Sequence, residues 1–132
     1  MKNIPIIITG HGALPIALQN SSQMLVGKRD RLYTLCLHEG VGLENFIRIT
    51  SDLISKIKDA ENMMVFVDLQ GGTPWNAIVG LNDSRISLIA GVNLPMLIEV
   101  LILRDQTSNV NELVNCAIDA AKKSVVFKTF PI

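Results

Sequence analysis

Short apolar runs alternate with amphipathic segments along almost the whole chain. Ile4–Ile8 and Met63–Val67 are apolar throughout, which is typical of strands buried on both faces of a parallel sheet. Two further apolar runs, Leu32–Leu37 and Ile86–Ala90, predict strands of similar length. A last strand is predicted over Val125–Phe130.

Between these runs the apolar residues recur at three- and four-residue spacing, which predicts helices. The clearest helix is predicted over residues 42–58, where Phe46, Leu53 and Ile54 share one face. The other helices are predicted over residues 14–25, 75–80, 95–104 and 109–123.

Residues at the ends of these helices have side chains that suit helix termini. Gly27 is the predicted C-cap of the first helix. Thr73 is the predicted N-cap of the third helix, with Pro74 as its first helical residue. Asn109 with Glu112 resembles a capping box at the start of the last helix.

The predicted elements therefore follow the order strand–helix four times, then a helix and a strand. This order predicts the α/β class, with a three-layer, doubly wound, open and mainly parallel sheet. No internal repeat or linker interrupts it, so residues 1–132 are expected to form a single domain.

Composition narrows the classes of partner and location. Hydrophobic residues make up 48% of the 132 residues, and 12 Lys and Arg balance 12 Asp and Glu, which argues against nucleic acid as a partner. The apolar run at the amino terminus is too short for a signal peptide or a membrane span, so a cytoplasmic protein is expected. Cys36 and Cys116 lack metal-ligand spacing and are expected to be core thiols.

In an open parallel sheet, ligands bind beyond the carboxyl ends of the strands. His11 follows the first strand between Gly10 and Gly12, beside a predicted helix start that favours anions, and its neutral imidazole is a potential nucleophile. Gly12 is therefore expected to help bind a phosphate. The alternative is a turn histidine without a function.

Asp68 ends the third strand, and its carboxylate could accept a hydrogen bond from the His11 imidazole. That bond would select the tautomer and stabilise positive charge on the ring, the orienting logic of a catalytic triad. The alternative is a turn or capping aspartate.

The loop Gly71–Gly72–Thr73 offers backbone N–H groups and a hydroxyl that can hold phosphate oxygens, although a simple tight turn is the alternative. It contains no Lys, which argues against a nucleotide-binding P-loop. Trp75 and Asn93 are the candidate partner-contacting residues, with a core role for Trp75 and a turn-shaping role for Asn93 as alternatives. No metal set is complete around His38, and no cofactor is expected.

Three segments together resemble a known family. They are Ile6–Gly12 (IIITGHG), Val67–Ala77 (VDLQGGTPWNA) and Ala90–Leu97 (AGVNLPML), and their order and spacing fit across nearly the whole chain. The chain resembles the enzyme IIA component of the mannose–fructose–sorbose family of the phosphoenolpyruvate-dependent sugar phosphotransferase system (PTS). One departure is Gly10, because family members often carry Thr directly before the histidine.

The resemblance implies that His11 is phosphorylated by the phosphocarrier HPr, as tele-phosphohistidine, and passes the group to an enzyme IIB subunit. Asp68 would be the hydrogen-bond partner of His11, and the loop at residues 71–73 would lie beside the phosphoryl group. The membrane subunits IIC and IID would use the phosphate during sugar uptake. The resemblance further implies a homodimer that exchanges the edge strand, here Val125–Phe130, and an IIB partner on a separate chain.

Two other functions remain open. A phosphotransferase subunit of dihydroxyacetone kinase also has a IIA-like domain, although the segments Gly71–Asn76 and Gly91–Met96 favour the sugar-transport type. A regulator whose phosphorylation state is read by another protein is the second alternative. The transported sugar is not readable from the sequence.

Overall fold

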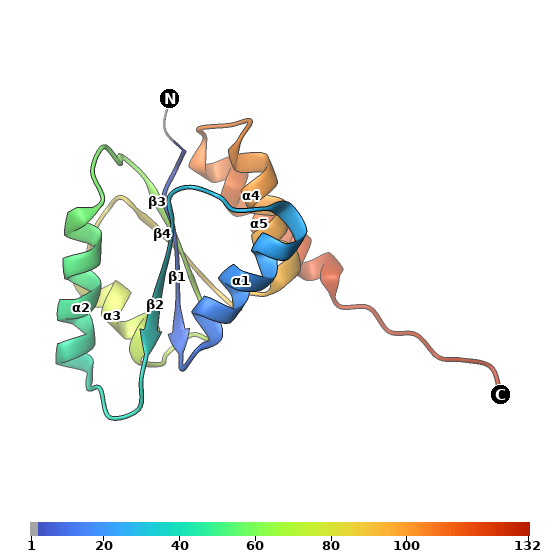
Figure 1. Ribbon diagram of the computed structural model, residues 1–132, viewed down its shortest axis with the longest axis horizontal. Coiled ribbons are helices and arrows are strands. Elements are labelled where there is room, and N and C mark those ends of the chain that lie inside the picture. The colour runs from blue at the N-terminus through green and yellow to red at the C-terminus, as the bar shows by residue number, and fades with distance from the viewer. Residues whose placement is uncertain (1–2) are drawn as a thin grey trace.

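The computed structural model describes residues 3–132, and these contain four strands and five helices (Figure 1). In chain order they are β1 (Ile6–His11), α1 (Leu14–Val26), β2 (Leu32–Leu37), α2 (Leu43–Lys56), β3 (Met63–Val67), α3 (Thr73–Leu81), β4 (Ile86–Ala90), α4 (Leu94–Arg104) and α5 (Val110–Ser124).

The four strands form one sheet in the order β2-β1-β3-β4, and every pairing is parallel. The register places Thr9 of β1 beside Leu35 of β2 and Val67 of β3. Because parallel strands run in the same direction, the residues that follow all four strands meet at one edge of the sheet. The predicted α/β class and doubly wound sheet are confirmed.

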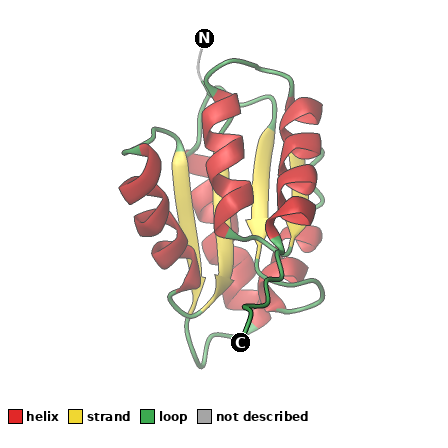
Figure 2. Cartoon of the chain, turned by 90° about the vertical axis from the view of Figure 1, so that its right-hand side faces the viewer, coloured by secondary structure: helices red, strands yellow, loops and turns green. Residues whose placement is uncertain are grey.

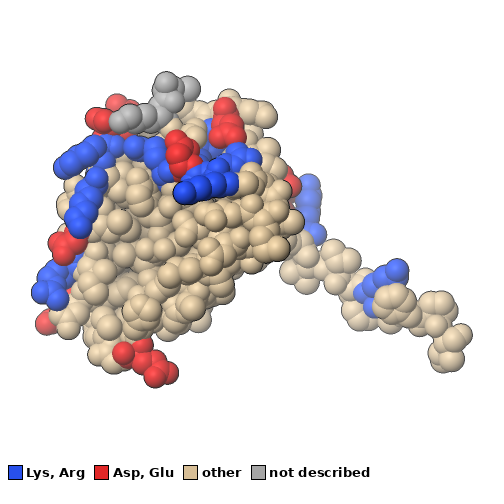
Figure 3. Space-filling model, viewed as in Figure 1, with Lys and Arg blue, Asp and Glu red and all other residues tan. Residues whose placement is uncertain are grey.

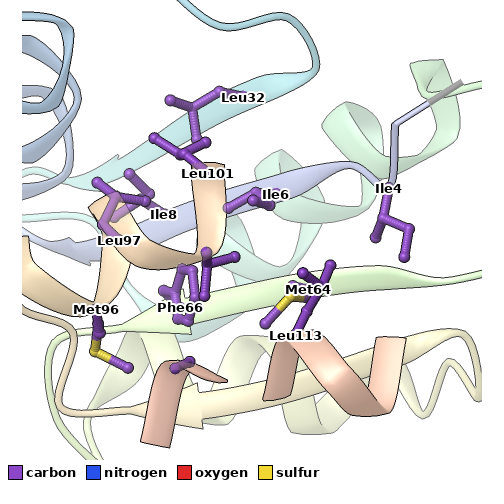
Figure 4. Close-up of a cluster of buried hydrophobic side chains, with 12 residues drawn as sticks. Ile4, Ile6, Ile8, Leu32, Met64, Phe66, Met96, Leu97, Leu101 and Leu113 are labelled. Carbon is purple, nitrogen blue, oxygen red and sulfur yellow. The ribbon is translucent and has the colours of Figure 1, made fainter. Parts of the chain in front are cut away.

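Helices cover both faces of this sheet (Figure 2). On the face covered by α1, α4 and α5, Ile6, Ile8 and Phe66 pack with Leu97 and Leu113, as Figure 4 shows. The opposite core joins neighbouring strand residues to helices α2 and α3; its members include Ile7, Val65, Phe46, Ile54 and Ile78. Alternate residues of β1 thus enter opposite cores, and each such side chain contributes about 2 kcal/mol on burial.

Strand β1 is longer at its carboxyl end than the apolar run suggested. Pairing with β2 continues through Gly10 and His11, which lie opposite Cys36 and Leu37. His11 is therefore the last residue of a strand, and the turn begins only at Gly12, whose φ is +61°. The strand backbone holds His11 more rigidly than a turn would.

The predicted N-cap of α3 is wrong by one residue. Gly72, with φ −82° and ψ 176°, is the N-cap, and Thr73 is already helical. The carbonyl of Gly72 accepts the first helical hydrogen bond, 2.9 Å from the N–H of Asn76. No side chain caps this end of the helix. The Gly27 C-cap and the Asn109 N-cap are confirmed, and Asn109 accepts from the N–H of Asn111.

The predicted strand over residues 125–130 does not form in this chain's own sheet. These residues run away from the body of the molecule as an extended tail (Figure 1), and Val125, Val126 and Phe127 are each more than 80% exposed. A strand needs a neighbour for its N–H and C=O groups, and the tail has none among residues 3–132. Exchange of this segment with a second copy stays a prediction.

Arg104 of α4 joins elements at the edge of the sheet opposite His11. Its guanidinium is fully buried and donates to the carbonyl oxygens of Ile4, Asp30 and Arg31 at 2.6 to 3.1 Å. These bonds tie α4 to the beginnings of β1 and β2. Within residues 3–132, no helix is both long enough and apolar enough to cross a membrane.

Candidate functional site

The imidazole of His11 lies at the carboxyl edge of the sheet, at the end of β1, which is one of the two inner strands. Its side chain is 49% exposed, so a molecule in solution can reach it. Nδ1 lies 2.8 Å from Oδ2 of Asp68, which follows the neighbouring strand β3. The predicted approach of Asp68 to His11 is therefore present in the structure.

Asp68 is held by a set of donors that leaves it ionised. Its Oδ2 also accepts from the backbone N–H of His11 at 2.9 Å, and its Oδ1 accepts from the N–H of Leu69 at 2.9 Å. Partial burial by itself would raise the pKa of the Asp68 carboxyl, but the hydrogen bonds from His11 and Leu69 together lower that pKa below its ordinary value. A carboxylate acceptor at Nδ1 keeps the proton on Nδ1 and leaves the lone pair on Nε2.

The Nε2 edge of the ring faces the loop Gly71–Gly72–Thr73. A Cβ added to Gly72 would lie 3.0 Å from Cε1 and 3.4 Å from Nε2 of His11, so any side chain at position 72 would crowd the ring. Within residues 3–132, the N–H groups of residues 71–73 and the Thr73 hydroxyl donate no hydrogen bond to another protein group. Such donors beside a helix start can hold a phosphoryl group on Nε2.

Gly12 shapes the backbone beside His11, but its N–H is already hydrogen-bonded. Its N–H donates to the carbonyl oxygen of Leu37 at 2.9 Å, which continues the pairing of β1 with β2. Because this bond occupies its only backbone donor, the predicted phosphate-binding role of Gly12 has no support in the geometry. Its positive φ instead turns the chain from β1 toward α1.

The two candidate partner-contacting residues have different surroundings. Trp75 lies in the first turn of α3 and is half-buried. The Asn93 side chain is used within the chain: its oxygen caps α4 by accepting from the N–H of Met96 at 3.0 Å, and its amide lies 3.4 Å from the Ser124 hydroxyl. His38, which has no assigned role, is exposed beyond β2.

Three residues of the site carry no role in the sequence analysis. A Cβ added to Gly10 would lie 3.0 Å from Cγ of Asp68, so the glycine admits the carboxylate to His11. Leu69 lies beside Gly72, and Asn76 donates from Nδ2 to the carbonyl oxygen of Gly71 at 3.3 Å. Two features of the sequence could have indicated these roles: the glycine directly before His11, and the side-chain amide of Asn76 in the first turn of the helix that follows the loop.

The surface around the site carries few charges. Lys, Arg, Asp and Glu gather along the edge of the molecule opposite His11 and over α2, with a further acidic group at the lower edge, where β1 and β2 end, while the surface over α1 shows none (Figure 3). The thirteen residues of α1 include no Lys, Arg, Asp or Glu. No group of three or more His, Cys, Asp or Glu within residues 3–132 is placed to hold a metal ion.

Comparison with known sequences gives one consistent family. The model of a family described as "PTS system fructose IIA component" matches residues 5–118. The chain is 38% identical over 104 residues to the fructose-specific EIIA component of the PTS from Bacillus subtilis, covering 77% of this chain and 71% of that protein. It is 30% identical over 124 residues to the mannose-specific EIIAB component of Escherichia coli, covering 92% of this chain but only 38% of that longer protein.

Solved structures agree with this comparison. Component EIIA of a phosphotransferase system from Streptococcus agalactiae superposes with a TM-score of 0.82 at 26% identity, covering 94% of this chain and 96% of the other. A mannose/sorbose-specific IIA subunit from Enterococcus faecalis gives a TM-score of 0.86 at 23% identity, over 99% and 98% of the two chains, and supports the fold.

Proposed function

This chain belongs to the family of PTS IIA components of the fructose–mannose type, and on that premise we propose that Nε2 of His11 carries a phosphoryl group from HPr to an enzyme IIB subunit. The observation that carries the proposal is the pairing of Nδ1 with Asp68 at 2.8 Å, which turns Nε2 toward the donors of residues 71–73. Members of the family are phosphotransfer proteins of sugar uptake systems.

In the proposed first step, the Nε2 lone pair attacks the phosphorus of a phosphohistidine on HPr. A bond forms between Nε2 and phosphorus as the N–P bond of the donor breaks, and the electron pair of that bond returns to the donor imidazole. The second step repeats this displacement, with a nucleophile of enzyme IIB attacking the phosphorus and His11 leaving. No proton has to leave Nδ1 in either step.

Asp68 supports both steps by acting on the other side of the ring. The imidazole gains positive charge when Nε2 bonds to phosphorus, and the ionised carboxylate at 2.8 Å stabilises that charge. Because Asp68 also accepts from the backbone N–H of His11, the carboxylate cannot follow the ring if the ring rotates. Asp68 therefore fixes both the tautomer of the His11 imidazole and the orientation of the ring, which determines where Nε2 points.

In this proposal, the loop of residues 71–73, at the start of α3, holds the transferred phosphoryl group. The N–H groups of residues 71–73, the Thr73 hydroxyl and the dipole of α3 stabilise the phosphoryl oxygens as charge spreads over them. The site is open, so a partner protein must complete it. The charge-free α1 begins three residues after His11 and exposes Leu14 and Ile16, which suits docking by apolar contact.

The proposal extends to the assembly of the protein. All described elements pack on one sheet, and we take residues 1–132 as a single IIA domain. The edge of β4 and the exposed apolar tail of residues 125–132 suit exchange between two copies, each tail pairing with the sheet of the other.

The test is phosphorylation in a defined mixture of phosphoenolpyruvate, enzyme I and HPr. The wild-type protein is expected to take an acid-labile phosphate, and His11→Ala, which removes the nucleophile, is expected to take none. His38→Ala is the matched control and keeps the label, because its exposed side chain makes no hydrogen bond to Asp68 or to residues 71–73 in the described chain. Labelling of His11→Ala at the wild-type level refutes the proposal. Transfer to IIB, and not to a dihydroxyacetone kinase subunit, is the second expected result.

A further inference from the structure

Asn76 holds two consecutive carbonyl groups of the loop that faces His11. Its backbone N–H donates to the Gly72 carbonyl oxygen at 2.9 Å, and its side-chain Nδ2 donates to the Gly71 carbonyl oxygen at 3.3 Å. Both bonds come from one residue in the first turn of α3. The loop is thus fastened to the helix at two adjacent peptide groups.

Fastening a carbonyl also sets the direction of the next N–H. A trans peptide group is planar, and its C=O and N–H point in opposite directions. The Gly71 carbonyl shares its plane with the N–H of Gly72, and the Gly72 carbonyl shares its plane with the N–H of Thr73. By holding both carbonyls, Asn76 directs both N–H groups away from itself.

The first of these peptide groups depends on the side chain. It joins two glycines, and Gly71 has φ +89°, so the local backbone has the widest freedom to rotate. The second peptide group is held by the backbone hydrogen bond that starts α3, which every residue except proline would make. Only the Gly71–Gly72 peptide therefore needs the Asn76 amide.

This peptide lies against the reacting edge of His11. A Cβ on Gly72 would be 3.4 Å from Nε2, so a group bonded to Nε2 lies within reach of the Gly72 N–H. The Asn76 side chain is exposed in the free protein, and a docked partner would exclude water and strengthen its hydrogen bond.

We propose that Asn76 is a positioning residue for phosphoryl transfer: it does not touch the phosphoryl group, but its amide holds the Gly72 N–H toward the oxygens of a phosphoryl group on His11. This inference rests on the proposed function. It adds Asn76 to the side chains of His11, Asp68 and Thr73, and Asn76 acts through the loop backbone where Asp68 acts through the ring.

The experiment measures transfer from phosphorylated HPr to four variants and the wild type. Asn76→Leu and Asn76→Asp have similar size and no donor, whereas Asn76→Gln keeps the amide. Asn115→Leu, an exposed asparagine of α5, is the control for the same surface change on another helix. For Asn76→Leu we expect kcat to fall about tenfold, less than for outright removal of a donor, with KM for phosphorylated HPr unchanged. For Asn76→Asp we expect a larger fall in kcat. We expect Asn76→Gln to keep most of the wild-type kcat, and Asn115→Leu to have the wild-type kcat.

Amide proton shifts distinguish positioning from a structural role. On phosphorylation of the wild type, the amide protons of Gly72 and Thr73 are expected to move downfield as they bind phosphoryl oxygens. In phosphorylated Asn76→Leu, only the shift of Gly72 is expected to shrink. A wild-type kcat for Asn76→Leu, equal loss in the Leu and Gln variants, or an unchanged Gly72 shift each overturns the inference while leaving His11 as the carrier. Failure of the wild type to take label overturns the proposed function and this inference with it.

Discussion

Replacement of Gly72 by alanine tests the reacting edge of His11 with a single methyl group. The added Cβ would lie 3.0 Å from Cε1 of His11 and 3.2 Å from Cδ1 of Leu69. Both contacts are tighter than carbon atoms normally make, so the ring and the leucine have to give way by a few tenths of an ångström. The backbone of Gly72 is ordinary extended chain, with φ −82°, so alanine introduces no backbone strain.

The expected loss follows from that displacement. The ring cannot move freely, because Asp68 holds Nδ1 at 2.8 Å. A misplacement of about 1 Å at a reacting centre costs about 100-fold in rate, so a shift of a few tenths of an ångström is expected to slow transfer about fivefold, which corresponds to about 1 kcal/mol. Stability should also change, because alanine is a poorer N-cap than glycine by up to about 1 kcal/mol.

Gly42 supplies a matched control. It is the N-cap of α2, its φ of −84° and ψ of 170° nearly equal those of Gly72, and an added Cβ would meet nothing within 4 Å. Gly42→Ala therefore carries the same capping penalty without the contact to His11. The assay is the initial rate of phosphoryl transfer from phosphorylated HPr, with unfolding midpoints measured alongside. Equal rates for Gly72→Ala and Gly42→Ala would show that the loop does not approach the reacting nitrogen.

Three further predictions concern Asp68 and the tail. Asp68→Asn is expected to fold but to transfer about 100-fold or more slowly, because the amide neither selects the Nδ1–H tautomer nor balances charge on the ring; an unchanged rate would remove Asp68 from the mechanism. Since the pKa of Asp68 is lowered on folding, its ionised carboxylate stabilises the fold at pH values above the ordinary carboxyl pKa. The difference in the free energy of unfolding between wild type and Asp68→Asn, measured in urea, is therefore expected to be at its maximum at about pH 6. That difference is expected to shrink below about pH 4. Deletion of residues 125–132 is expected to convert a dimer into a monomer in light scattering, because it removes an exposed apolar segment that pairs with no strand of the described residues; a full-length monomer would contradict strand exchange.

The sequence predicts the layers and the order of the elements because these depend on local patterns. Ile6–Ile8 and Met63–Val67 are apolar on both sides of the strand, and each enters two cores as that pattern requires. The approach of Asp68 to His11 is also predictable, because both residues lie at the carboxyl ends of parallel strands. Their order along the chain alone brings them to one edge of the sheet.

What the sequence could not predict depends on individual hydrogen bonds. Thr73 and Gly72 are both acceptable N-caps, and only the bond from Asn76 to the Gly72 carbonyl identifies the glycine. Gly12 looks like a phosphate-binding glycine until its N–H is found on the Leu37 carbonyl. The tail of residues 125–130 has strand-like composition, but it joins no sheet among residues 3–132, because a strand also needs a neighbouring edge that composition cannot specify.

The half-exposed imidazole of His11 has a consequence for how long the protein can stay charged with phosphate. About half of the ring surface faces water, and the loop of residues 71–73 borders only the Nε2 edge. Between encounters with other proteins, a phosphoryl group on this ring stands in solvent and is not enclosed. On the proposed function, the lifetime of the group would be set by the intrinsic hydrolysis of phosphohistidine, and the phosphorylated fraction of the protein would follow the supply of donor.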